Sequence, residues 1–221
     1  MNFNYIDIEN WKRKEYFNHY LNTVRCTYSM TANIDITNLL ALSKKSKKKL
    51  YPVMIYMITT VVNKHEEFRC SFDTNKKLGC WNKMNPSYTI FHKEDESFSS
   101  IWSEYNNDLS VFYGNAMNDI QQYSNAVGFL PKPNEPSNTF PISCIPWTSF
   151  TGFQLNIYNE GDYLLPIFTI GRYFEQDGKW LLPISIQVHH AVCDGYHVSR
   201  FINELNEMAA NANEWFPFHS A

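Results

Sequence analysis

The sequence lacks an excess of basic residues, a long apolar run, internal repeats and a flexible linker. A net charge of −3 over 221 residues is not the excess of positive charge that is typical of nucleic-acid-binding proteins. The longest apolar stretch, residues 52–62, is too short to cross a membrane, which needs about 20 residues. The lack of repeats excludes hexapeptide-repeat architectures. The lack of a linker predicts one domain over residues 1–221. The one basic run, residues 44–49, is interpreted as a solvated loop between two helices.

Closely spaced cysteine pairs are also missing. None of the five cysteines forms a CxxC pair or shows zinc-ligand spacing. The first residues have neither the basic nor the apolar segment of a secretory signal. We therefore expect free thiols and a cytoplasmic protein. The cysteines are Cys26, Cys70, Cys80, Cys144 and Cys193.

Helical and extended patterns alternate along the chain, and its last third is strongly β. Asn10 is expected to cap a first helix. Pro52 lies in the first turn of a helix that is apolar on nearly every face, which predicts a buried central helix. Residues 153–158 alternate like a strand, 176–178 are typical of a hairpin, and 198–209 carry a helical apolar stripe. This order predicts an α+β fold, a mixed β-sheet with helices packed on one face.

Two adjacent histidines, His189 and His190, follow a strand-like run and precede the last predicted helix. Asp194 and Gly195 close this segment. Imidazole ionises near neutral pH, so it can take a proton from a substrate hydroxyl that then attacks a thioester. A metal site is disfavoured, because neighbouring strand residues point to opposite faces and no HExxH spacing is present. The residues alone leave a structural histidine and a base for acyl transfer both open.

Residues 187–197 resemble the HHxxxDG signature of CoA-dependent acyltransferases, and most closely that of the trimeric chloramphenicol acetyltransferases. Four more segments resemble this family in chain order: residues 10–15 its N-terminal helix, 51–56 its central helix, 141–147 its serine-bearing strand and 201–203 its last helix. Plant acyltransferases, peptide-synthetase condensation domains and dehydrogenase-complex cores share the signature. Those relatives are larger, duplicated or attached to lipoyl domains.

The resemblance implies a role for each motif residue. His190 would be the general base that takes the proton from the 3-hydroxyl of chloramphenicol, with His189 as a packing neighbour. The hydroxyl would attack acetyl-CoA directly through a tetrahedral intermediate, and Ser143 would stabilise its oxyanion. Asp194 would pair with Arg13 and hold the turn. Acetyl-CoA is the implied co-substrate, and no metal ion is expected.

The resemblance also implies partners and binding residues. It implies chloramphenicol and acetyl-CoA as ligands, antibiotic resistance as the outcome, and a homotrimer with sites between subunits; no nucleic acid or membrane partner is expected. One alternative is a same-fold acyltransferase with another alcohol or amine acceptor, and the other is a non-catalytic protein that binds the antibiotic. The expected drug-binding residues are Tyr20, Cys26, Phe153, Leu155, Ile167 and Thr169. The expected cofactor-side residues are Tyr51, Trp147, Arg172 and Tyr173.

Overall fold

The computed structural model describes residues 2–157 and 161–217. Its strands are β1 (Phe3–Tyr5), β2 (Thr27–Asp35), β3 (Cys70–Phe72), β4 (Leu78–Trp81), β5 (Asn85–His92), β6 (Ser97–Trp102), β7 (Thr139–Ile145), β8 (Ile167–Gly171), β9 (Phe174–Gln176) and β10 (Lys179–His189). Its helices are α1 (Lys14–Asn18), α2 (Thr37–Lys45), α3 (Leu50–Lys64), α4 (Leu109–Tyr123), α5 (Gly195–Ala210) and α6 (Ala212–Trp215). Short helical turns lie at Ile8–Asn10, His19–Thr23 and Glu66–Phe68.

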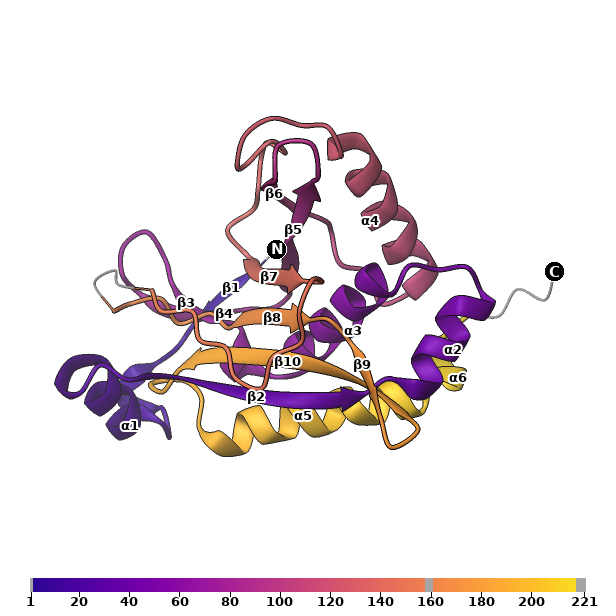
Figure 1. Ribbon diagram of the computed structural model, residues 1–221. Helices are drawn as coiled ribbons and strands as arrows, with labels where there is room; N and C mark the ends of the chain where they lie inside the picture. The colour runs from indigo at the N-terminus through magenta and orange to yellow at the C-terminus, as the bar shows by residue number, and fades with distance from the viewer. Residues whose placement is uncertain (1, 158–160, 218–221) are drawn as a thin grey trace.

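The main sheet is mixed and has the strand order β2-β10-β8-β7-β5-β6, with β9 paired to β10. Strand β7 runs parallel to both β5 and β8, whereas β10 runs antiparallel to β2 and β8. Figure 1 shows the arrowheads of β7 and β8 at one end of the sheet and that of β10 at the other. A small antiparallel sheet, β1-β4-β3, lies beside it.

Helices cover one face of the main sheet, which confirms the predicted α+β fold. Alternate residues of β10, such as Ile184 and Ile186, are fully buried on this face. The predicted central helix is α3, in which ten of fifteen residues are buried. Helix α5 buries the predicted stripe and lies along β2 (Figure 1). Among the described residues, no helix is both long and apolar enough to cross a membrane.

Two local predictions are wrong. Asn10 caps no α-helix; it closes a short turn and donates to the Asp7 carboxylate, and α1 begins only at Lys14. Of the strand predicted over 153–158, residues 153–157 alternate in polarity but form no strand, and Tyr158 lies outside the described residues. The backbone of these described residues forms hydrogen bonds with side chains of β2 and β10, and not with the backbone of a neighbouring strand. The predicted hairpin is present, with positive φ at Asp177 and Gly178 as a tight β-turn requires.

The expectation of five free thiols is wrong for one pair. Cys70 and Cys80 occupy directly opposed positions of β3 and β4, with their Cα atoms 4.1 Å apart, and form a disulfide. Strand pairing of residues ten positions apart brings the sulfurs together, and cysteine spacing alone does not reveal that pairing. The other three cysteines, all in the described part of the chain, are free thiols.

Candidate active site

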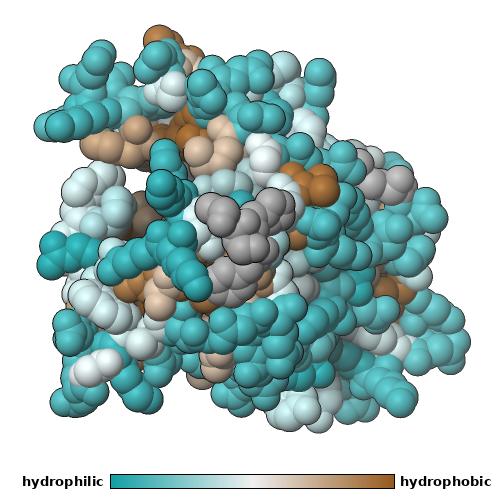
Figure 2. Space-filling model, turned by 90° about the vertical axis from the view of Figure 1, so that its right-hand side faces the viewer, coloured by the Kyte–Doolittle hydropathy of each residue, from teal (hydrophilic) through white to brown (hydrophobic). Residues whose placement is uncertain are grey.

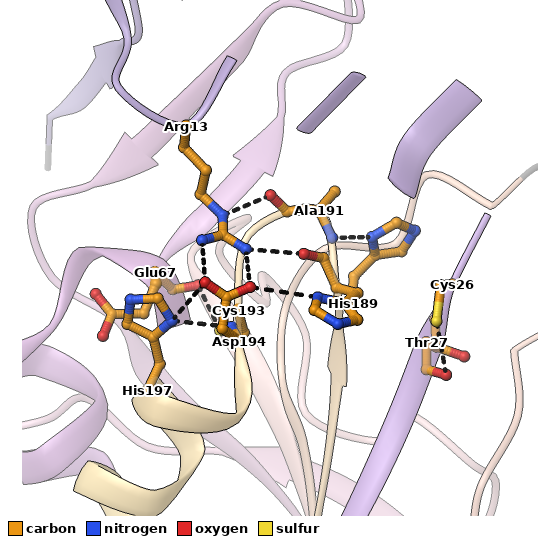
Figure 3. Close-up of polar contacts among 10 residues, drawn as sticks. Arg13, Cys26, Thr27, Glu67, His189, Ala191, Cys193, Asp194 and His197 are labelled. Atoms are coloured by element: carbon orange, nitrogen blue, oxygen red, sulfur yellow. Dashed lines mark hydrogen bonds and ion pairs between the residues drawn. The ribbon is translucent and has the colours of Figure 1, made fainter. Parts of the chain in front are cut away.

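A single guanidinium group organises the turn between β10 and α5. Arg13 donates from Nη1 and Nη2 to the two carboxylate oxygens of Asp194, at 2.6 and 2.5 Å. It also donates to the carbonyl oxygens of His190 and Ala191, at 2.9 and 2.8 Å (Figure 3). Hydrogen bonding to Arg13 holds the pKa of the Asp194 carboxyl below its usual value. One side chain from the N-terminal region therefore fixes both the backbone and the carboxylate of the motif.

Aromatic rings and the Asp194 carboxylate surround the His190 imidazole. Tyr20 stacks on its face, with ring centroids 3.9 Å apart and planes 6° apart, and Tyr28 meets it edge-on at 5.2 Å. Nδ1 of His190 lies 3.3 Å from Oδ1 of Asp194. The backbone N–H of His190 donates to the carbonyl of Cys26 at 2.8 Å. Two predicted drug-binding residues, Tyr20 and Cys26, thus lie beside His190.

His189, the last residue of β10, is 2% exposed. Its Nδ1 accepts a hydrogen bond from the backbone N–H of Ala191 at 3.1 Å, which tightens the same turn. Burial lowers the pKa of His189, although a hydrogen bond with the Gly161 backbone opposes this shift. Within residues 2–157 and 161–217, no three His, Cys, Asp or Glu side chains are grouped so as to hold a metal ion.

Ser143 lies on a separate, mostly apolar cavity of about 710 Å³. It is directly paired with Thr169 of β8, so the two side chains share one face of the sheet. Five other predicted site residues line this cavity with Ser143: Thr169, Phe153, Leu155, Tyr51 and Trp147. Burial raises the pKa of the Tyr51 hydroxyl, which donates to the carbonyl of Thr89. This phenol therefore stays neutral and orders the cavity wall.

Five of the ten predicted binding residues are not among the residues that line the cavity: Tyr20 and Cys26, which lie beside His190, and three others. Ile167 is buried in β8, opposite Gln187 of β10. Arg172 follows β8, and its backbone N–H donates to the carbonyl of Thr148. Tyr173 packs its ring against Trp180. The structure therefore places these residues near the site's strands but does not bring them to the cavity.

His190 follows the last residue of β10, whereas Ser143 is level with the middle of that strand. The residue of β10 level with Ser143 is Ser185, through the register Ser143–Thr169–Ser185. His190 comes five positions after Ser185, which is about 16 Å along the strand and roughly 10 Å across two strand spacings. Within one chain, a single hydroxyl group cannot touch both side chains.

Comparison with known proteins shows the family of the chain. A model of the chloramphenicol acetyltransferase family matches residues 1–206. A Clostridium butyricum chloramphenicol acetyltransferase is 63% identical over 97% of this chain and 98% of its own length. The chain belongs to the chloramphenicol acetyltransferase family. Enzymes of the same name from Campylobacter coli and Staphylococcus aureus are 54% and 47% identical, over 94% and 97% of this chain and 99% and 100% of their own lengths.

Two solved structures have the same fold as this chain. A chloramphenicol acetyltransferase superposes with a TM-score of 0.83 at 22% identity, covering 94% of this chain and all of that one. The dihydrolipoamide acetyltransferase of Azotobacter vinelandii superposes with a TM-score of 0.65 at 15% identity, covering 91% and 88%. The architecture is thus that of CoA-dependent acyltransferases.

Several residues that line the cavity were missed from the sequence. Lys49, the last residue of the basic run, is exposed and lies between two helices, as predicted for a solvated loop, but it also lines the cavity. Phe91 and Phe98 line the wall from β5 and β6, and Phe91 packs edge-on against Trp147 at 4.6 Å. Aromatic residues in strands are more often core residues, so no sequence signal separated these two from the core.

Proposed function

We propose that this protein transfers the acetyl group of acetyl-CoA to the 3-hydroxyl of chloramphenicol in the cytoplasm and so confers resistance. The observation that carries the proposal is the identity of 47–63% with named chloramphenicol acetyltransferases over at least 94% of the chain. Residues 1–221 act as one domain in this proposal. Acetylation removes a hydrogen-bond donor from the drug and adds bulk, which would abolish its binding to its target.

His190 is the general base of the proposed reaction. Oδ1 of Asp194 lies 3.3 Å from the buried Nδ1, which has no hydrogen-bond partner among the described residues. In the proposed reaction the proton of the neutral imidazole is on Nδ1, which leaves the lone pair of Nε2 free. Nε2 takes the proton of the drug hydroxyl as the oxygen attacks the acetyl carbonyl carbon. The tetrahedral intermediate then expels the CoA sulfur, which receives the proton from the imidazolium. The stacked Tyr20 ring holds the imidazole in place for both transfers.

Ser143 supplies the oxyanion donor, and the cavity supplies the binding surface. A hydroxyl aimed at a developing alkoxide stabilises it most in a dry environment, and the cavity wall is largely apolar. Phe153, Leu155 and Thr169 support binding of a neutral, largely apolar drug. Lys49 supports binding of a phosphate-bearing co-substrate such as acetyl-CoA.

We propose a homotrimer in which each site joins His190 of one subunit to the Ser143 cavity of the next. The separation of these side chains along the sheet supports this arrangement. Exposed apolar residues beside the cavity support it too, among them Phe98 and Phe129, whose rings pack together. Figure 2 shows a mostly hydrophilic face with hydrophobic residues at the top, at the level of α4, β5 and β6, and in smaller groups lower down.

Release of free CoA thiol from acetyl-CoA, measured with and without chloramphenicol, tests the function. We expect release that depends on the drug and yields the 3-O-acetyl product. Thiol release with another alcohol or amine, but not with chloramphenicol, would identify the same-fold acyltransferase alternative. Tight drug binding by calorimetry without any thiol release would identify the non-catalytic binding alternative.

A further inference from the structure

Four hydroxyl side chains form a row across the face of the sheet that the helices do not cover. Thr31 of β2 is paired with Ser185 of β10, Ser185 with Thr169 of β8, and Thr169 with Ser143 of β7. Directly paired residues point to the same side of a sheet. Ser143 and Thr169 line the cavity, whereas Ser185 and Thr31 lie beyond its edge. The inner half of the row, Ser143 and Thr169, therefore faces the cavity, and the outer half, Ser185 and Thr31, does not.

The outer half of the row holds the backbone of Phe153. Ser185 donates from its hydroxyl to the carbonyl of Phe153 at 2.7 Å, and the Phe153 N–H donates to the Thr31 hydroxyl at 3.3 Å. Two positions further along β10, Gln187 accepts the N–H of Leu155 on Oε1 at 3.2 Å. Ser185 and Gln187 are 3% and 6% exposed. Their side chains thus bind alternate residues of an extended segment that forms no strand in the described chain.

Burial of these polar groups has a cost unless they are hydrogen-bonded. The alternate residues Ile184 and Ile186 are buried on the opposite face with apolar side chains that need no such partners. The hydrogen bonds fix the height and register of the segment over the sheet. They therefore set how far the side chains of Phe153 and Leu155 reach into the cavity that contains Ser143.

We propose that Ser185 and Gln187 are positioning residues that determine acceptor specificity, because they place the Phe153–Leu155 wall opposite Ser143. The inference rests on the proposed function, in which this wall contacts the drug. Neither residue touches the reacting atoms. Both act through the backbone of the wall, so their loss changes the fit of the acceptor and leaves the base and the oxyanion donor in place.

The test compares Ser185→Ala and Gln187→Met with wild type in steady-state kinetics. Loss of one such hydrogen bond is expected to raise KM for chloramphenicol roughly tenfold. KM for acetyl-CoA and kcat should each change by less than about threefold, because chemistry is unaffected. Ser185→Thr and Gln187→Glu keep a donor and an acceptor oxygen, respectively, and should restore KM. Asn33→Ala changes an exposed residue on the same face of β2 and serves as the matched control.

Amide hydrogen exchange of the full-length protein gives a readout that does not depend on activity. The Phe153 and Leu155 amides should exchange faster in the two variants and at the wild-type rate in the rescue variants and the control. A KM for chloramphenicol that stays at the wild-type value despite faster exchange would overturn the inference. A lower kcat, a similar rise in the KM for both substrates and a lower Tm would also overturn it. Together these changes would indicate general destabilisation of the protein. A wild-type protein that releases no thiol would refute the proposed function instead, and drug affinity by calorimetry would then decide the positioning role.

Discussion

Arg13 illustrates how one side chain can hold the turn after β10 from a distant part of the chain. Its guanidinium contacts both oxygens of Asp194 and the carbonyls of His190 and Ala191. Arginine suits this task because its planar fork presents several donors in fixed directions. From its sequence context Arg13 would be expected to be an ordinary surface cation. Its side chain is instead 14% exposed and donates four hydrogen bonds.

Arg13→Lys should destabilise the protein, although the charge is retained. Lysine cannot reach the carboxylate in a bidentate manner and also satisfy two carbonyls, so we expect a loss of about 3 kcal/mol in the free energy of unfolding. Urea denaturation monitored by fluorescence measures this loss. Lys12→Ala, at an exposed neighbouring position, is the control and should leave the midpoint unchanged. Equal midpoints for Arg13→Lys and wild type would contradict the role given to the fork.

His190→Ala and Ser143→Ala should each lower kcat, for different reasons. Removal of a positioned base is expected to cost roughly 10²–10⁴-fold. Removal of an oxyanion donor is expected to cost roughly 10²–10³-fold. Both variants should still bind chloramphenicol and CoA in calorimetry. A Ser143 variant with normal kcat and a raised KM would show that the hydroxyl serves ground-state binding.

His189 should make stability depend on pH on the acid side of neutrality. Burial lowers its folded pKa below the ordinary value of 6.5, so the unfolded state takes up a proton first as pH falls. Stability is therefore retained above that value and declines as pH falls through the folded pKa. His189→Asn keeps an acceptor for the Ala191 N–H but does not titrate. Its Tm should fall less than that of wild type between about pH 7.5 and about pH 5.5. If Tm falls equally with pH in His189→Asn and wild type, His189 is not the group that makes stability depend on pH.

At the scale of elements, periodic patterns predicted the long helices best. Helix α3 and the stripe of α5 follow directly from where their apolar residues fall. The strands β1 and β4 have three and four residues, too few for a pattern to emerge. The segment 153–157 has the alternation of a strand, but alternation shows only that one side is apolar and does not supply a partner. For that reason its binding to side chains of β10 could not be predicted.

The candidate site was also predictable only in part, because sequence patterns reveal local features but not contacts between distant segments. The turn around His190 is a local feature, so consecutive residues describe it well. The cavity is assembled from β5, β6, β7, β8 and the start of α3, and its members are distant in sequence. Lys49 and Phe98 consequently had no local signal, and the resemblance placed Arg172 and Tyr173 where the structure shows no cavity contact. Strand register decides such placements, and a single sequence does not contain it.

Gly171→Ala should disturb the cavity from the end of β8. A Cβ at this position would lie 2.7 Å from the Phe150 ring and 2.8 Å from Pro183, so the segment over the sheet must move. Phe150 packs near Phe153, with ring centroids 5.6 Å apart, and the shift should reach the cavity wall. We expect a raised KM for chloramphenicol, measured by thiol release. Gly114→Ala, where a Cβ meets nothing within 4 Å, is the control. Equal KM values for Gly171→Ala and wild type would contradict this coupling.

At the scale of the whole molecule, the proposed base and the proposed oxyanion donor lie too far apart within one chain for a single hydroxyl group to touch both. Co-expression of His190→Ala and Ser143→Ala chains therefore provides a test of the proposed trimer. Random mixing should give about a quarter of the sites both an intact base and an intact donor, and activity should return in proportion. Separately expressed variants mixed without exchange of subunits form the control. Mixed assemblies that stay inactive would show that each site lies within one chain.

The hydroxyl row also limits how these strands can change. Side chains alternate between the two faces of a strand, so parity along β10 assigns Ser185 to the cavity side and Ile184 to the core. A substitution alters one position, but deletion of a single residue in β10 would turn the core isoleucines outward and the hydroxyl and amide groups inward. Insertions and deletions in this strand are thus far more damaging than substitutions, and length variation must be confined to the loops.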